Sequence, residues 1–353
     1  MSLEILVVDD SALLRRVECD IINSDNKFKV TDTCKDGLEA LEKLRTKKYD
    51  GVVLDINMPR MDGLELLQQL QKEKIKANIV MASTLTVEGA DEAIKSLELG
   101  AIDFVTKPSN IIEAKGDAFK KALLDVLYAA TKARVHFKKP SLTPAADKTA
   151  AFSVNRLKKP GQNKIIAIAS STGGPKALQS VIPKIPADID APVVLVQHMP
   201  AGFTSSMAAR LNELSKVQVK EAEDGELLKK GVVYIAPGGK HIVVNKKGAS
   251  HVIGYSDMPP IGGLKPCANI MFDSLGQTGF DEVVCVVLTG MGADGTNGIL
   301  SLGKKKSVHV IAQDESSCIV YGMPRAIYEA GVVDEVVALS KVAETITKNV
   351  GVK

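Results

Sequence analysis

The chain of 353 residues contains no tryptophan, and only 4% of its residues are aromatic. Proteins that bind single-stranded nucleic acid usually stack bases on aromatic side chains, so this scarcity argues against that class. Cysteine is also sparse, and its five occurrences are scattered without C-x-x-C spacing. We therefore expect buried free thiols rather than disulfides or metal ligands at Cys19, Cys34, Cys267, Cys285 and Cys318.

Long apolar runs are absent as well. None approaches the ~20 residues that cross a bilayer. The first residues, MSLEILVVDD, carry acidic groups where a signal peptide would carry basic ones. These features predict a cytoplasmic protein without membrane insertion. The formal net charge of +3 is too small by itself to indicate nucleic-acid binding.

The sequence does contain a repeated alternation of short apolar runs and helical stretches. Residues 1–132 hold five such units, which predict an α/β domain with a doubly wound parallel sheet. The expected strands are Ile5–Val8, Phe28–Thr33, Val52–Leu54, Ile79–Ala82 and Ile102–Val105. The expected helices are Ala12–Asn23, Gly37–Thr46, Gly63–Glu73, Val87–Leu99 and Asp117–Lys132.

Polar residues follow these expected strands, at the edge where ligands of such sheets bind. They are Asp9, Asp10, Asp55, Asn57, Asp62, Ser83 and Lys107. Three carboxylates at one edge repel one another unless a cation lies among them, and an all-oxygen ligand set suits Mg²⁺. Lys107 would then pair with an anion, such as a phosphoryl group on an aspartate. The alternative is that these acids cap helices, as Asp10 could for a helix from Ser11.

In combination, the Asp9–Asp10 pair, the D-x-N-M-P-x-M-D-G run from Asp55 and the Lys107–Pro108 pair resemble the receiver domain of two-component response regulators. The resemblance implies a flavodoxin-like fold that regulates an output elsewhere in the chain. It implies phosphorylation of Asp55, Mg²⁺ bound by Asp9, Asp10, Asp55 and the Asn57 carbonyl, Lys107 as the phosphoryl partner, and Ser83 and Phe104 as the switch pair.

Residues 133–163 show no helix or strand period. They include Pro140, Pro144 and Pro160 and are rich in lysine and arginine. We interpret this stretch as a flexible tether between two domains. A basic patch for an acidic partner or a membrane surface is the less favoured alternative.

Residues 164–353 resume the strand and helix alternation and predict a second α/β domain with a mainly parallel sheet. The expected strands are Ile165–Ala169, Val193–Val196, Val232–Ala236, Val283–Leu288 and Val308–Ala312. The expected helices are Ala177–Ile182, Phe203–Leu214, Ile270–Thr278 and Ala343–Asn349. Shorter strand-like pieces with glycine turns between Val217 and Tyr255 suggest an antiparallel edge.

A serine, a histidine and an aspartate follow three of these expected strands. They are Ser170 or Ser171, His198 and Asp294. Because the carboxyl ends of parallel strands share an edge, these side chains are predicted to converge. Such a set suits a hydrolase in which serine attacks, histidine takes its proton and aspartate orients the imidazole. Gly290 and Gly292 free the backbone to aim the Met291 N–H at an oxyanion, a donor worth roughly 3–4 kcal/mol.

Other interpretations of these residues stay open on spacing alone. The turn at residues 170–175, SSTGGP, also suits a phosphate-binding loop, although the G-x-G-x-x-G, G-K-[ST] and G-x-S-x-G patterns are missing. His241, after a Pro-Gly-Gly-Lys turn, competes with His198 as the base. Asp294 could simply cap a helix beginning near Gly295.

Six motifs of the second domain together resemble the catalytic domain of the chemotaxis protein-glutamate methylesterase family. They are residues 169–174 (ASSTGG), 197–200 (QHMP), 223–226 (EDGE), 234–238 (YIAPG), 288–295 (LTGMGADG) and 322–325 (GMPR). Ala169 and Ser170 stand where the family has Gly and Ala. By position, the resemblance implies Ser171 as nucleophile, His198 as base, Asp294 as orienting acid and the Met291 amide as oxyanion donor.

The resemblance implies a phosphorylation-activated hydrolase in chemotaxis signalling. Its substrates would be glutamate methyl esters and certain glutamines of methyl-accepting chemoreceptors, and its phosphodonor a chemotaxis histidine kinase. Mg²⁺ would serve the receiver, and the esterase reaction would need no cofactor. A second hypothesis is an output domain that binds a nucleotide or partner through residues 172–174. A third, DNA-binding output, lacks a helix-turn-helix with a basic recognition helix.

Overall fold

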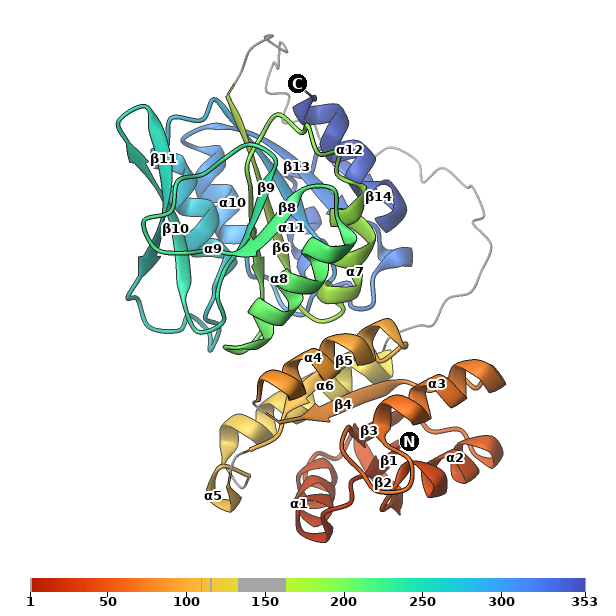
Figure 1. The fold of residues 1–353 in the computed structure, drawn as a ribbon. Helices are drawn as coiled ribbons and strands as arrows, with labels where there is room; N and C mark the ends of the chain where they lie inside the picture. Colours follow the sequence, from red (N-terminus) through yellow and green to blue (C-terminus); the bar gives the residue numbers. More distant parts are fainter. Residues whose placement is uncertain (1, 85, 109, 115, 133–162, 353) are drawn as a thin grey trace. The chain divides into compact units, whose positions relative to one another are not determined.

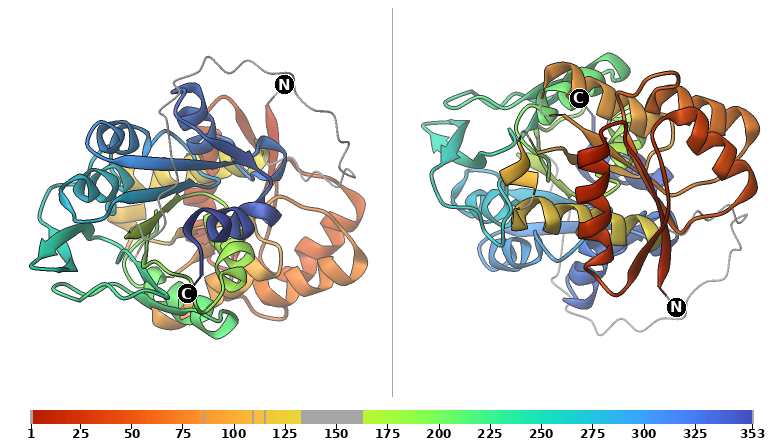
Figure 2. Two further views of the ribbon diagram at one scale, coloured as in Figure 1. Left: turned by 90° about the horizontal axis from the view of Figure 1, so that it is seen from above. Right: turned by 90° about the horizontal axis from the view of Figure 1, so that it is seen from below.

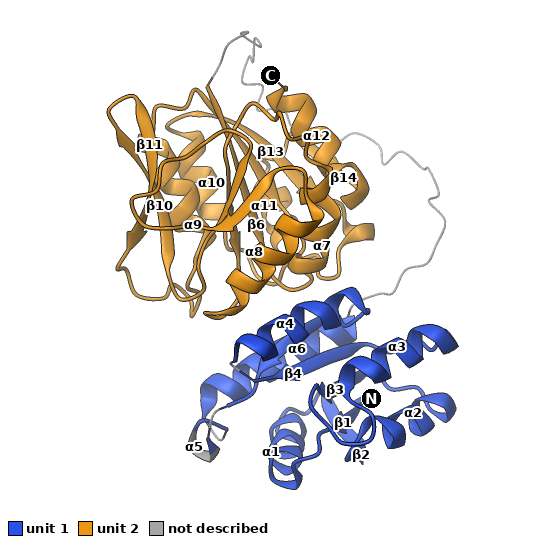
Figure 3. Cartoon of the chain, in the orientation of Figure 1, with its two compact units in different colours: residues 1–134 blue, residues 135–353 orange. Residues whose placement is uncertain are grey.

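The computed structural model describes residues 2–84, 86–108, 110–114, 116–132 and 163–352. The chain divides into two compact units, residues 1–134 and residues 135–353 (Figure 3). The predicted tether, apart from Asn163, lies outside the described residues. Within the described ranges no helix is both long and apolar enough to cross a membrane.

Unit 1 is built on a five-stranded parallel sheet with the order β2-β1-β3-β4-β5 (Figure 1). The strands are β1 (Leu3–Val8), β2 (Phe28–Cys34), β3 (Gly51–Asp55), β4 (Ile79–Ser83) and β5 (Asp103–Thr106). Every residue of β3 and β4 is buried, which explains why both appear in the sequence as unbroken apolar runs. The predicted doubly wound sheet is confirmed.

Six helices connect or follow these strands. They are α1 (Ala12–Asn23), α2 (Gly37–Thr46), α3 (Gly63–Glu73), α4 (Val87–Glu98), α5 (Ile111–Ala114) and α6 (Asp117–Lys132). Helix α1 packs against α6, whereas α3 packs against both α2 and α4, and Figure 2 shows α1 in red beside α6 in yellow. The sequence did not predict α5, which is only one turn long.

Side-chain caps set the beginnings of these helices. Ser11, not Asp10, caps α1 by accepting a hydrogen bond from the Leu14 N–H, so the capping alternative for Asp10 is wrong. Asp62, which we grouped with the strand-end acids, caps α3 and forms a capping box with Glu65. Asp10 therefore remains available for another role at the sheet edge.

Unit 2 contains a seven-stranded sheet, all parallel, with the order β14-β13-β12-β6-β7-β9-β8. The strands are β6 (Lys164–Ser170), β7 (Val193–Gln197), β8 (Gln218–Glu221), β9 (Val232–Ile235), β12 (Glu282–Val287), β13 (Ser307–Gln313) and β14 (Glu335–Val337). The chain leaves β6 toward β7 on one side and returns at β12 on the other. Strand β6 thus lies at the point where the strand order reverses, which is where such sheets place their sites.

An antiparallel pair, β10 (His241–Lys247) and β11 (Ser250–Ser256), forms a second sheet of its own. The predicted antiparallel part is therefore present. Strands β8 and β9, from the same stretch of sequence, pair in parallel within the large sheet instead. Helix α9 packs against β10, and Figure 1 shows the pair beside α9 and α10.

The helices of unit 2 cover the large sheet and complete the core. They are α7 (Gly174–Val181), α8 (Phe203–Leu214), α9 (Ala268–Ser274), α10 (Thr296–Gly303), α11 (Met323–Glu329) and α12 (Val342–Val350). The helix predicted at Ile270–Thr278 begins two residues earlier and ends in a 3₁₀ turn, Leu275–Gln277. All five cysteines are free thiols, but Cys19 and Cys318 are only partly buried, so the prediction of buried thiols holds for Cys34, Cys267 and Cys285 alone.

Candidate active site

Ser171 stands in a sharp turn between β6 and α7. Strand β6 ends at Ser170, and Gly173 adopts the left-handed conformation (φ +74°) just before the helix begins. Gly174 has no room for a side chain, because a Cβ there would lie 1.9 Å from Oε1 of Gln197. The two glycines therefore permit the turn and the close approach of Gln197.

The structure distinguishes the two candidate serines. Ser170 is completely buried, and its hydroxyl donates to Oε1 of Gln197 at 2.7 Å. Nε2 of Gln197 donates to the carbonyl oxygens of Ser171 (2.9 Å) and His198 (3.2 Å). Ser171 is only partly buried. Gln197 thus binds the backbone of both candidate catalytic residues, and Ser171 is the serine that a substrate can reach.

His198 follows β7 directly, beside the Ser171 turn. Strands β6 and β7 pair Ser170 with Gln197, and the His198 N–H donates to the Ser170 carbonyl at 3.1 Å. The ring nitrogen Nε2 lies 2.8 Å from Oδ2 of Asp294. The other ring nitrogen, Nδ1, is buried and has no hydrogen-bond partner among the described residues. A proton on Nε2 leaves the lone pair of Nδ1 free to act as a base.

Asp294 is held by the first residues of α9 rather than by the helix that follows it. Its carboxylate accepts hydrogen bonds from the backbone N–H groups of Ala268 (2.6 Å) and Asn269 (3.0 Å) and from the Cys267 thiol (3.1 Å). Helix α10 begins after Gly295 without a side-chain cap, so the simple capping interpretation of Asp294 is wrong. Burial alone would raise the pKa of Asp294, but His198 and these donors lower it to about 2.

The loop after β12 brings Met291 next to the nucleophile turn. The Ser171 N–H donates to the Thr289 carbonyl at 3.1 Å. A side chain at position 290 would bring its Cβ to 2.8 Å from Cβ of Ser171, so only glycine fits at this position. Gly292 adopts φ +83°, a conformation that glycine allows. Met291 thus lies between two glycines, directly after the residue that packs against Ser171.

The competing base His241 is fully buried and has both ring nitrogens engaged. Nδ1 accepts the Cys267 N–H at 3.1 Å, and Nε2 lies 3.2 Å from the Pro259 carbonyl. Neither nitrogen is left for a serine proton, so His198 is the better supported base. His251 is similarly engaged, because its Nε2 accepts the Gly279 N–H at 2.8 Å.

Unit 1 gathers a second polar cluster at the carboxyl edge of its sheet. Carboxylate oxygens of Asp9, Asp10 and Asp55 lie within 4.8 Å of one another. Nζ of Lys107 lies 2.6 Å from Asp9 and 2.7 Å from Asp55. Burial raises the pKa of Asp55, and repulsion from Asp9 and Asp10 adds to this effect against the attraction of Lys107. Three oxygen donors that oppose one another's ionisation fit a divalent cation.

The two residues of the predicted switch pair, Ser83 on β4 and Phe104 on β5, are both buried in unit 1. Ser83 is buried, and its hydroxyl donates to the Gly89 carbonyl of α4 at 2.7 Å. Phe104 is 7% exposed. The Asn57 side chain donates to Glu92 at 3.1 Å. The Ser83 hydroxyl is thus engaged with the beginning of α4.

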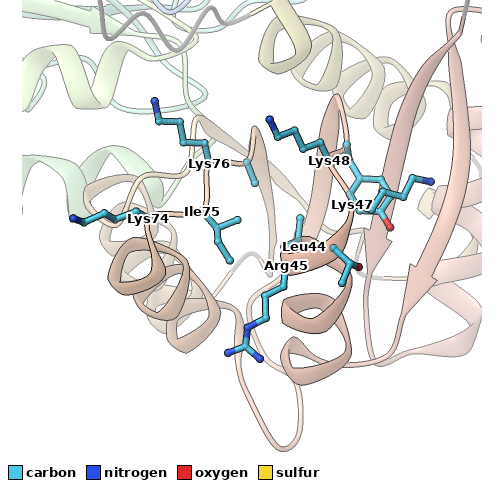
Figure 4. A pocket seen from close by; sticks show the side chains of 10 residues that line it. Leu44, Arg45, Lys47, Lys48, Lys74, Ile75 and Lys76 are labelled. Carbon is cyan, nitrogen blue, oxygen red and sulfur yellow. The ribbon is translucent and has the colours of Figure 1, made fainter.

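A pocket of about 370 Å³ lies in unit 1 at the ends of α2 and α3 (Figure 4). It is lined mainly by basic residues, and two of them form ion pairs: Arg45 with Glu73, and Lys47 with Glu4 and Asp32. Lys74 and Lys76 extend away from one another in Figure 4. Its lining residues include no serine, histidine or carboxylate, so we do not assign the chemistry to it.

Several residues that shape the site were missed by sequence reasoning. Gln197 supports the backbone of Ser171 and His198, and Cys267 and Asn269 hold Asp294. Thr289 links the nucleophile turn to the loop after β13, because its hydroxyl donates to the Thr172 carbonyl at 3.0 Å and accepts the Val320 N–H. Gln197 and Thr289 lie within the quoted motifs, whereas Cys267 and Asn269 lie outside them, and spacing alone does not reveal such contacts.

The fold and the site define a class: a receiver unit joined to an α/β unit with a serine, histidine and aspartate at its switch point. Residues 5–115 match the response regulator receiver domain family, and residues 166–346 match the CheB methylesterase family. The chain belongs to the CheB methylesterase family.

Relatives of full length share this two-part organisation. The protein-glutamate methylesterase/protein-glutamine glutaminase of Halalkalibacterium halodurans is 41% identical over 346 residues, which cover 98% of each chain. The protein of the same name from Bacillus subtilis is 42% identical over 351 residues, again 98% of each chain. The crystal structure of the Thermotoga maritima CheB methylesterase catalytic domain is 40% identical, with a TM-score of 0.52, and covers 53% of this chain and 99% of that chain.

Proposed function

We propose that this protein is a phosphorylation-activated hydrolase that removes methyl groups from glutamate methyl esters of chemoreceptors and deamidates receptor glutamines. The observation that carries the proposal is the His198–Asp294 hydrogen bond, beside a sharp glycine-containing turn that presents Ser171. The names of the full-length relatives support the substrate class. Adaptation in chemotaxis signalling would be the consequence.

Ser171 is the nucleophile in the mechanism that we derive. Its hydroxyl transfers a proton to Nδ1 of His198 while Oγ attacks the ester carbonyl of the substrate. Asp294, ionised because its pKa is about 2, stabilises the imidazolium through the proton on Nε2. The imidazolium then protonates the leaving methoxide, and methanol departs from an acyl-enzyme.

Water then hydrolyses the acyl-enzyme, with water as the attacking group and Ser171 as the leaving group. His198 takes a proton from water, the hydroxide attacks the acyl carbonyl, and the proton returns to Oγ of Ser171. A glutamine substrate follows the same path with ammonia as the leaving group. The Met291 N–H would stabilise the oxyanion in both steps, which is worth roughly 3–4 kcal/mol for one donor.

Control would reside in unit 1. We propose that Asp55 accepts a phosphoryl group from a chemotaxis histidine kinase, with Mg²⁺ held by Asp9, Asp10, Asp55 and the Asn57 carbonyl. The metal would neutralise charge on the phosphoryl oxygens, and Lys107 would contact the group once it is formed. The rotation of Ser83 away from Gly89 would accompany this step and bias the state of α4.

Methanol release from a methylated chemoreceptor tests the proposal. Ser171→Ala should reduce release to the uncatalysed level, because the neighbouring hydroxyls of Ser170 and Thr172 are buried. Ser170→Ala is the matched control and should retain activity within a few-fold. If Ser171→Ala kept most of its activity, the nucleophile would be wrong.

An output domain that only binds a ligand would behave differently. A serine-reactive phosphonate should label Ser171 in the wild type and fail to label it in His198→Ala, because the base is then missing. Labelling of neither protein would favour the binding-module hypothesis over the hydrolase.

A further inference from the structure

His241 is a buried histidine that the mechanism above does not use. It is the first residue of β10 and is 0% exposed. Histidines are seldom buried without a structural or chemical reason. One residue that this ring contacts, Cys267, also contacts Asp294 of the candidate active site.

The first contact fixes the protonation state of the ring. Nδ1 accepts the Cys267 N–H at 3.1 Å, so this nitrogen carries no proton. Nε2, 3.2 Å from the Pro259 carbonyl, must then be the donor. Burial lowers the pKa of His241, with Lys265 acting in the same direction and the Pro259 carbonyl and Asp294 acting against it. The neutral ring therefore holds the loop that joins β11 to α9 at two points.

A second set of hydrogen bonds links Cys267 and the residues after it to Asp294. Cys267 directly precedes α9, and its thiol donates to Oδ1 of Asp294 at 3.1 Å. The next two backbone N–H groups, of Ala268 and Asn269, donate to the same carboxylate. A shift of the Cys267 backbone would therefore move three of the donors that orient Asp294.

We propose that His241 is a positioning residue of the hydrolase: it fixes the Cys267 backbone, and through it the Asp294 carboxylate that aligns His198. The proposal rests on the function proposed above. Supporting groups of this kind determine whether a catalytic set is held within about 0.5 Å of its productive geometry. His241 itself touches neither the nucleophile nor the substrate in this role.

Three substitutions separate positioning from general stability. His241→Asn can retain an acceptor near the position of Nδ1, whereas His241→Gln places its amide near Nε2 and leaves the Cys267 N–H unpaired. His251→Phe is the matched control, because His251 is also buried and also accepts a backbone N–H, from Gly279. All are made in the full-length chain.

The pH dependence of kcat/KM is the first measurement. A less well aligned Asp294 stabilises the His198 cation less, so the acid limb should move to lower pH in His241→Gln. We expect kcat to fall about tenfold or more with little change in KM. His241→Asn should recover part of both effects, and His251→Phe should show neither. Equal profiles for His241→Gln and the wild type would overturn the proposal.

The low-field proton resonance of His198 Nε2–H, assigned with ¹⁵N-labelled histidine, is a second readout that needs no turnover. It should shift or weaken in His241→Gln and persist in His251→Phe. An unchanged resonance in a folded His241→Gln protein would also refute positioning. Because this readout needs no turnover, its result does not depend on whether Ser171 is the nucleophile of a hydrolase.

Discussion

Gln197 shows how one buried side chain can organise a catalytic pair. It is 2% exposed and binds the Ser170 hydroxyl and the carbonyl groups of Ser171 and His198. The family resemblance places Ala at position 170, so the Ser170 hydroxyl adds a bond to Gln197 that an alanine lacks. The amide of Gln197 thus has three partners at the end of two neighbouring strands.

Gln197→Leu should damage both stability and activity. It removes three hydrogen bonds: the Ser171 carbonyl keeps the Gly174 N–H, whereas the Ser170 hydroxyl and the His198 carbonyl lose their bonds to Gln197, each at a cost of about 1–3 kcal/mol. A displacement of about 1 Å at the nucleophile can lower kcat by about 100-fold. Urea unfolding and methanol release measure the two effects. Ser170→Ala, which removes only one of these bonds, should lower stability alone. A folded Gln197→Leu protein with wild-type kcat would contradict this role.

Glu18 is a residue whose charge works against the fold. It lies on α1 with 1% exposure, and burial, reinforced by Asp9 and Asp55, raises its pKa from 4.5 to about 8. Between these two values the unfolded chain has lost the proton that the folded unit keeps. The contribution of Glu18 to the free energy of unfolding is therefore most favourable below pH 4.5, and it falls as the pH rises toward 8.

Glu18→Gln should make unit 1 more stable than the wild type at about pH 8 and should weaken this pH dependence. Hydrogen exchange of β1 and α1 peptides in the full chain, corrected for intrinsic rates, gives the measurement. Glu88→Gln, on the exposed side of α4, is the control. Lower protection in Glu18→Gln at that pH would contradict the explanation.

At the scale of elements, β7 and the start of α9 together set the charge of Asp294. Burial would raise the pKa of this carboxyl, but His198, which follows β7, and then the Ala268 N–H and the Cys267 thiol lower it to about 2. The histidine–aspartate pair should therefore gain only one proton across the range in which histidine titrates.

The pH profile of the wild type tests this statement. On the acid side of the profile and above about pH 2, log(kcat/KM) should fall with a limiting slope of no more than about one, because Asp294 stays ionised there. A limiting slope of about two would mean that Asp294 is also protonated in this range. Asp294→Asn should lower kcat sharply, since the amide no longer stabilises the imidazolium.

The sequence predicted most elements and the residues of the site, but not what supports them. Apolar runs identified β6, β7 and β12 because both faces of these strands are buried. Strand β14 was missed, since it is a short edge strand whose exposed residue breaks the pattern. Strand β8 falls in the stretch expected to hold strand-like pieces, but it pairs in parallel rather than antiparallel. The roles of Gln197 and His241 depend on contacts between segments far apart in the chain, which a single sequence does not encode as a motif.

At the scale of the whole molecule, the two polar clusters should respond separately to metal. A small phosphodonor with Mg²⁺ should stimulate methanol release, and EDTA should remove only the stimulated part, because the esterase residues include no metal ligand set. Asp55→Asn should show no stimulation with or without Mg²⁺. Initial rates under these conditions provide the measurement. A loss of unstimulated activity in EDTA would contradict the statement that only the cluster of unit 1 depends on metal.

The central position of β6 has a consequence for how activity is acquired. Ser171 and His198 follow β6 and β7, but Asp294 arrives with β12, 96 positions after His198. A nascent chain that has emerged only as far as β11 holds a nucleophile and a base with no orienting carboxylate. During refolding, long-range pairing of β12 with β6 is expected to be slow. Esterase activity should therefore return after the far-ultraviolet circular dichroism signal.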